Sequence, residues 1–144
     1  MTLSLAAAQT ILNTALDHCR KGNFKPMAVV VLDARGELKV GASEDGTSLK
    51  RAEIAHGKAF GALSLGMGSR SIYKRAKEQA FFVASVTAVV GGALVPVPGG
   101  VLIRDAAGAV IGAIGISGDT SDNDEAAATA GITAAGFTAD PGAD

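Results

Sequence analysis

The sequence has few aromatic residues, one cysteine and almost no net charge, and each shortage excludes a class of protein. Aromatic residues make up 4% of the 144 residues, which leaves little for a surface that stacks nucleic-acid bases. The 13 Lys and Arg and 14 Asp and Glu residues give a formal net charge of −1, so nucleic acid is not an expected partner. The single cysteine, Cys19, cannot form an intramolecular disulfide or a multi-cysteine metal site.

Long apolar runs and a basic leader are also missing. Apolar runs such as those around Val29 to Leu32 and Val101 to Ile103 are far shorter than the ~18 residues of a membrane span. No Lys or Arg precedes Arg20, so the basic start of a secretory signal is absent. We therefore expect a cytoplasmic protein without a membrane partner, in which Cys19 is a free thiol.

The remaining composition is that of a folded chain. Hydrophobic residues make up 48% of the sequence and the mean hydropathy is +0.31, which excludes a disordered protein. The length predicts a single domain over residues 1–144, with a frayed tail at 139–144. Residues 1–78 carry 12 basic and 7 acidic side chains (+5), whereas residues 79–144 carry 1 and 7 (−6). This division indicates either two solvated faces or a charge-complementary surface for self-association.

The spacing of apolar residues predicts an α/β protein. Helices are expected at 5–21, between an N-cap at Ser4 and a left-handed C-cap at Gly22, and after an N-cap at Ser48. Others are expected at 70–76, 77–86 and 123–136, the last with a capping pattern that starts at Ser121 or Asp122. Strands are expected at 26–33, 38–43, 101–104 and 110–117. Because short turns join the strands in pairs, the sheet should be antiparallel, with helices packed against it.

Glycines in the second helix and in the last strand predict close contacts. Gly57 and Gly61 interrupt the helix after Ser48, where the inward side is apolar and Lys50, Arg51 and Lys58 are expected to point outward. One face of the last strand is nearly flat and admits either a tightly packed helix or a ligand. Its residues are Ile111, Ala113, Gly115 and Ser117.

Three segments together resemble a known family. They are the stretch PVPGGVLIRDAAGAVIGAIGISGDTSDNDEAAATAG, the early hairpin MAVVVLDARGEL and the helical AEIAHGKAFGAL. The chain is similar to the GlcG/HbpS-like family, formerly DUF336, from about residue 5 to 136. The resemblance implies a profilin-like α/β fold and assembly into a homo-oligomer. Several members of the family bind haem, so the resemblance makes haem the first cofactor to consider.

Two histidines are the candidate axial ligands of a haem iron, because neutral imidazole is its usual protein ligand. His18 lies at the rim of the apolar stripe of the first helix, and His56 at the edge of the inward stripe of the second. Both also fit an ordinary structural role. The sequence has no Cys-x-x-Cys-His motif, which excludes covalent haem attachment, and its few histidines and cysteines predict no dedicated metal site.

A second group of residues is a candidate binding site for an anion. Backbone N–H groups of glycine turns and of a helix start attract carboxylates, such as haem propionates or small organic acids. The group consists of Gly99, Gly100, Gly115, Ser117 and Gly118, with Lys58 and Arg51 supplying the opposing charge. The alternative is that these glycines only permit a tight turn between strand and helix. The neighbouring acidic residues are explained by helix capping.

These observations leave three functions open. The leading hypothesis is a cytoplasmic accessory protein that binds a small ligand, with haem as the first candidate. The alternatives are an accessory enzyme that acts on a small organic acid near Lys58 and the Gly99–Gly100 loop, and a purely structural oligomeric partner. No catalytic residue can be assigned, because the sequence contains no catalytic triad order, phosphate loop or dinucleotide fingerprint.

Overall fold

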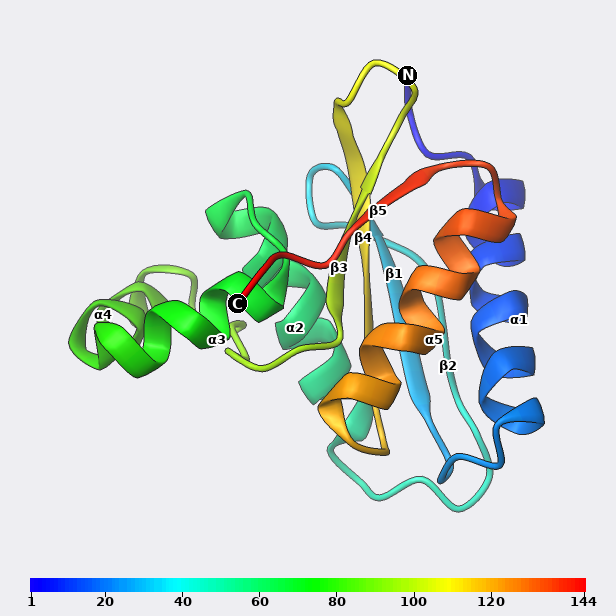
Figure 1. The fold of residues 1–144 in the computed structure, drawn as a ribbon, viewed down its shortest axis with the longest axis horizontal. Coiled ribbons are helices and arrows are strands. Elements are labelled where there is room, and N and C mark those ends of the chain that lie inside the picture. The colour runs from blue at the N-terminus through cyan, green and yellow to red at the C-terminus, as the bar shows by residue number, and fades with distance from the viewer.

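An antiparallel sheet of five strands, in the order β2-β1-β4-β3-β5, forms the centre of the protein (Figure 1). The computed structural model describes all of residues 1–144. The strands are β1 (Ala28–Asp33), β2 (Leu38–Ser43), β3 (Gly100–Arg104), β4 (Val110–Ser117) and β5 (Thr138–Asp140). The helices are α1 (Leu5–Lys21), α2 (Arg51–Leu65), α3 (Ser69–Glu78), α4 (Ala80–Val89) and α5 (Ser121–Ala134). The predicted α/β class and antiparallel sheet are confirmed.

Helices cover both faces of the sheet, with α1 and α5 on one side and α2 on the other (Figure 1). The inner strand β1 is buried on both faces because its alternate side chains enter different cores. Val29 and Val31 pack in the larger core with α1 and α5, while Val30 and Leu32 pack beneath α2. None of the helices is both long and apolar enough to pass through a membrane.

The sheet and its helices approach closely where the sequence has glycine. A Cβ atom on Gly115 of β4 would overlap the carbonyl oxygen of Ala55, so the flat strand face packs directly against α2. A Cβ on Gly57 would lie 2.7 Å from Cγ2 of Val95, and one on Gly61 would lie 3.0 Å from Cγ of Leu94. The close packing expected at these two glycines is therefore present, with the segment that precedes β3 as the partner.

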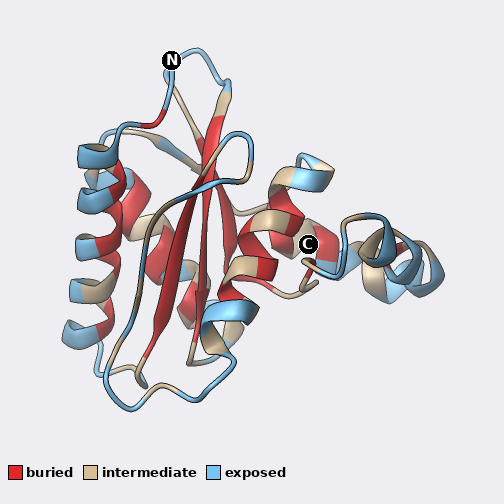
Figure 2. Ribbon diagram, turned by 180° about the vertical axis from the view of Figure 1, so that it is seen from behind, coloured by how far each residue is buried: buried red, intermediate tan, exposed pale blue.

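Helices α3 and α4 extend away from the sheet on the α2 side (Figure 1). Ile72, Val83 and Leu94 form a small core of their own, separate from the two cores at the sheet. In Figure 2 the buried residues gather in the sheet and on the helix faces toward it, whereas this pair of helices is mostly exposed. The pair is joined to the rest of the protein by few buried contacts.

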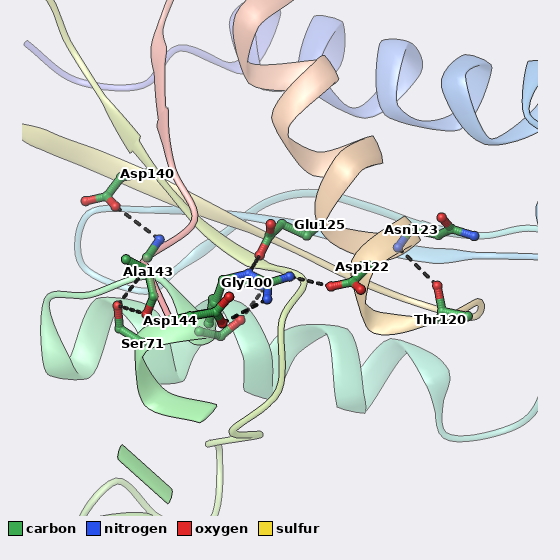
Figure 3. A network of polar contacts seen from close by, with 12 residues as sticks. Ser71, Gly100, Thr120, Asp122, Asn123, Glu125, Asp140, Ala143 and Asp144 are labelled. Atoms are coloured by element: carbon green, nitrogen blue, oxygen red, sulfur yellow. Dashed lines mark hydrogen bonds and ion pairs between the residues drawn. The ribbon is translucent and has the colours of Figure 1, made fainter. Parts of the chain in front are cut away.

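Residues 139–144, for which the sequence predicts a frayed tail, make defined contacts with the rest of the chain in the structure. Strand β5 pairs with β3, and Asp140 forms an ion pair with Arg104 at 2.9 Å. Beyond the strand, the backbone N–H of Ala143 donates to Ser71 Oγ at 2.9 Å (Figure 3). Three residues are too few to give a visible alternation of apolar and polar positions, so β5 has no signal in the sequence.

Some details at the helix ends also differ from expectation. Ser4 caps α1 as predicted, by accepting from the N–H of Ala7 at 3.1 Å. Gly22 is not left-handed; the positive φ of this turn belongs to Asn23. Ser48 does not cap α2, and its hydroxyl instead accepts from Arg51 Nε at 3.3 Å. Thr120, rather than Ser121, caps α5.

Candidate functional site

Two opposite charges, Lys58 and Asp124, are buried together between α2 and α5. Lys58 Nζ donates to Asp124 Oδ2 at 3.0 Å and to the carbonyl of Ile116 at 2.9 Å. Their side chains are only 3% and 2% exposed. Burial lowers the pKa of Lys58 and raises that of Asp124, and each shift is opposed by the charge of the partner.

The expectation that Lys58 points outward is therefore wrong. Lys58 lies three residues after Ala55 and four before Ala62, both of which are fully buried, so it shares their face of α2. Its spacing from these two alanines is that of the inward stripe, although the sequence-based expectation assigned it to the outward side. Its charge argued for solvent, and only the distant Asp124 explains its burial.

The Gly99–Gly100 loop lies beside Lys58, but its polar groups are engaged within the chain. Gly99 has a φ of +122°, and a Cβ there would lie 2.9 Å from Lys58 Nζ. The N–H of Gly100 donates to Ser69 Oγ at 2.7 Å, and the carbonyl of Gly99 accepts from Ile116 at 3.1 Å. Both glycines are buried. The Gly99–Gly100 loop therefore packs against Lys58 inside the protein.

The start of α5 is likewise occupied by groups of the same chain. Ser117 is buried, and its hydroxyl accepts from Arg51 Nη1 at 3.1 Å, while Gly118 packs against the Pro26 backbone. The Asp124 carboxylate, which also accepts from the N–H of Asp119 at 3.1 Å, pairs with Lys58. The structure thus gathers the predicted residues, but the carboxylate among them belongs to the chain and not to a ligand.

A second cluster of charges surrounds Arg70, which the sequence reasoning did not single out. Arg70 forms ion pairs with Asp122, with Glu125 at 2.9 Å and with Asp144 at 3.1 Å (Figure 3). These hydrogen bonds raise the pKa of Arg70 above its usual value. Ion pairs within one chain therefore neutralise part of the positive charge of residues 1–78 with negative charge of residues 79–144.

His56 lines an open groove of about 480 Å³ between α2 and the segment that follows α4. Its half-buried ring stacks on Phe60, with ring centres 5.4 Å apart and an angle of 21° between the planes. No hydrogen bond or ion pair in the structure engages its nitrogens. The groove is lined by Ala52, Glu53, His56, Gly57, Gly91, Gly92, Ala93 and Val95.

His18 has a different environment. It lies near the end of α1, on the opposite side of the sheet from α2, and it contacts Phe24 edge to face with ring centres 5.8 Å apart. It lines none of the five cavities of the structure. Because the sheet separates them, His18 and His56 of one chain cannot bind the same iron. The neighbouring Cys19 is fully buried, and burial raises the pKa of its thiol to about 12, so it is unreactive.

Comparison with solved structures shows the same fold in several proteins. PduOC, crystallised as a haem complex, superposes with a TM-score of 0.84 at 22% identity, over 95% of this chain and 97% of that one. The DUF336 protein ORFY of Klebsiella pneumoniae gives 0.84 at 24% identity, over 94% and 92%. HbpS gives 0.79 at 27% identity, over 92% and 89%.

Sequence comparison assigns the family. No curated protein matches the chain. The sequence model of the family described as "Haem degrading protein HbpS-like" matches residues 3–133, which is nearly the whole length. The chain therefore belongs to the HbpS-like family.

Proposed function

We propose that this protein binds haem in the groove beside His56, with the His56 imidazole as the iron ligand. The family description supports haem as the ligand. The observation that carries the choice of site is that a histidine without a competing hydrogen bond lines the largest cavity. A volume of about 480 Å³ lies within the range of sites that hold cofactors.

The lining of the groove fits a flat, largely apolar group. Ala93 and Val95 supply apolar contact, and Val95 itself packs against Gly57 of α2. A Cβ on Gly91 or Gly92 would meet nothing within 4 Å, so this wall faces open space. Stacking on Phe60 fixes the orientation of the His56 ring. Bound haem supplies a redox-active iron, and these residues would hold and orient it.

A cation at the rim of the groove suits the haem propionates. Lys58 cannot serve, because it is buried against Asp124. Glu53 lines the groove, and Lys50 Nζ lies 2.9 Å from Glu53 Oε1, which places the Lys50 amine at the rim. Lys50 therefore replaces Lys58 as the proposed partner of a propionate.

Burial of Lys58 also counts against the alternative of an enzyme for small organic acids. That hypothesis required Lys58 and the Gly99–Gly100 loop to be open to a substrate. In the structure both are buried. Lys58 donates to the carbonyl of Ile116, and the N–H of Gly100 donates to Ser69 Oγ. No other observation favours a carboxylate substrate, so haem binding is the single function proposed.

Hemin titration tests the proposal. We expect a saturable Soret shift at about one haem per subunit, and His56→Ala should weaken binding about tenfold or change the spectrum, because it removes the axial bond. His18→Ala is the matched control and should bind like the wild type, since His18 lies on the other side of the sheet. Lys50→Glu should lower the affinity without changing the spectrum.

Two results would contradict this assignment. An absorbance that grows without saturation would remove haem as a specific ligand. A spectral change in His18→Ala, with His56→Ala unaffected, would move the site to α1.

A further inference from the structure

Phe60 contacts both His56 and the turn between β1 and β2. It lies one helical turn after His56 in α2, and the two rings stack with their centres 5.4 Å apart. Its half-buried ring also packs on the core beneath α2. A Cβ on Gly36 of the turn would lie only 2.6 Å from Phe60 Cε2. The turn, Phe60 and His56 therefore form one row of contacts that ends at the groove.

The backbone of the β1–β2 turn is held by its own hydrogen bonds. The N–H of Gly36 donates to the carbonyl of Asp33 at 2.9 Å, and the N–H of Asp33 donates to the carbonyl of Glu37 at 2.9 Å. The Asp33 carboxylate accepts from the N–H groups of Arg35 at 2.9 Å and of Glu37 at 3.1 Å. Gly36 has a φ of +85°, which favours glycine. The turn is therefore a fixed support for the Phe60 ring.

The orientation of the His56 ring depends on Phe60. A histidine that binds a metal usually donates its second ring N–H to an acceptor of the protein, and this bond orients the ring. No hydrogen bond engages either ring nitrogen of His56. Its ring lies instead at 21° to the plane of Phe60, close to parallel. The stack therefore has the orienting role that a hydrogen bond has at other sites.

We propose that Phe60 and Gly36 are positioning residues of the His56 site. The β1–β2 turn holds the Phe60 ring, and the Phe60 ring holds the imidazole in the orientation in which it meets the iron. Neither residue lines the groove, so both act through His56. The inference rests on the proposed binding of haem at His56. It adds that the affinity of the groove depends on a turn outside it.

The turn between β3 and β4 supplies a matched control. The N–H of Gly108 donates to the carbonyl of Asp105 at 3.0 Å, and the Asp105 carboxylate accepts from Ala107 and Ala109, both at 2.9 Å. Gly108 also has a φ of +85°, but a Cβ there would meet nothing within 4 Å. Alanine strains the backbone in the same way at both glycines, whereas only Gly36→Ala also displaces Phe60.

Proton NMR of the haem-free protein tests the positioning directly. The sequence has two histidines, so His56→Ala assigns both sets of ring signals. A stacked phenyl face shields the imidazole protons, so the His56 signals should move downfield in Gly36→Ala and in Phe60→Leu. They should stay in place in Gly108→Ala and in Phe60→Tyr, which keeps an aromatic face. The signals of His18, which contacts Phe24 instead, should not move in any of these variants.

Hemin titration tests the consequence for binding. Gly36→Ala and Phe60→Leu should weaken hemin binding about threefold relative to Gly108→Ala and Phe60→Tyr, because the imidazole remains and only its orientation is lost. Unmoved His56 signals in Gly36→Ala, or equal hemin affinities of Gly36→Ala and Gly108→Ala, would overturn the positioning role. A wild type that binds no hemin, although its His56 signals respond as expected, would instead contradict the proposed function.

Discussion

The charge of Lys58 or of Asp124 does not indicate that the residue is buried, because the partner that makes burial possible is distant in sequence. Both lie on the buried faces of their helices, and they meet only in the folded chain. An ion pair of this kind adds little net stability, because desolvation of the charges offsets their attraction. It links instead two helices, α2 and α5, that lie on opposite faces of the sheet.

Loss of one member of this pair should be strongly destabilising. We expect Lys58→Met to lower the free energy of unfolding by about 3–5 kcal/mol, because Asp124 is left buried without a counter-charge. Urea unfolding of the single variants and of Lys58→Met/Asp124→Leu measures the coupling, and the double variant should recover most of the loss. A double variant that loses the sum of the two single effects would show that the charges do not interact.

The loss of unfolding free energy in Lys58→Met should also depend on pH. Burial raises the pKa of Asp124, so the folded state favours its protonated form. The neutral carboxyl is stable in the interior at low pH, and this contribution is lost as pH rises through the folded pKa. The destabilisation should therefore be smaller in acidic than in neutral buffer. The exposed pair Lys50–Glu53 is the control, and Lys50→Met should cost less than about 1 kcal/mol.

Gly115 offers a residue-scale test of the contact between α2 and the sheet. A Cβ there would overlap the backbone of Ala55, which cannot move without displacing α2. We expect Gly115→Ala to cost about 3 kcal/mol, seen as a lower melting temperature. Gly41→Ala on β2 is the control, because its Cβ would lie 3.4 Å from the nearest atom, the Val29 carbonyl oxygen. Equal melting temperatures for the two variants would contradict the close packing.

At the scale of elements, the two edges of the sheet are formed by different parts of the chain. Strand β2 forms one edge, and β5 covers β3 at the other. The strand is short, but Asp140 pairs with Arg104 and Asp144 pairs with Arg70, so the tail is attached to both β3 and α3. The C-terminal residues thus join two parts of the molecule that otherwise have few contacts.

Shortening the chain in two steps should separate these contributions. A chain that ends at Asp140 keeps β5 and loses the contact with Arg70, so its melting temperature should fall slightly. A chain that ends at Phe137 also exposes the edge of β3, and we expect a larger fall together with faster hydrogen exchange in β3. If both truncations melt like the full chain, the tail does not contribute to stability.

Elements with a long or regular pattern could be predicted from sequence, and short ones could not. Helix α1 begins and ends where its spacing predicts, from Leu5 to Lys21. Spacing alone does not tell which residues of α1 are buried: Leu5 is 55% exposed and Ile11 is fully buried, because the buried face depends on the position of α5. Helix α4 was predicted three residues early at both ends, since a helix that is apolar on all sides has no stripe to locate it.

For the whole molecule, the fold followed from local patterns, but the candidate site did not. Hairpin turns and apolar spacing define nearly all of the elements and their order. The groove of His56 requires α2 and residues 91–95 to lie together, and no local pattern encodes this contact. For the same reason, the sequence could place Lys58 near the Gly99–Gly100 loop but not show that Asp124 already occupies the position of the ligand.

The pairing of β1 with β4 has a consequence for the order in which the chain acquires its structure. The hairpin of β1 and β2 leaves the ribosome early, but the other edge of β1 is completed only by β4, from the last third of the chain. Contacts so distant in sequence form slowly. Until β4 has been synthesised, the second edge of β1 is unpaired, so a nascent chain of this protein exposes an apolar hairpin that is prone to aggregate.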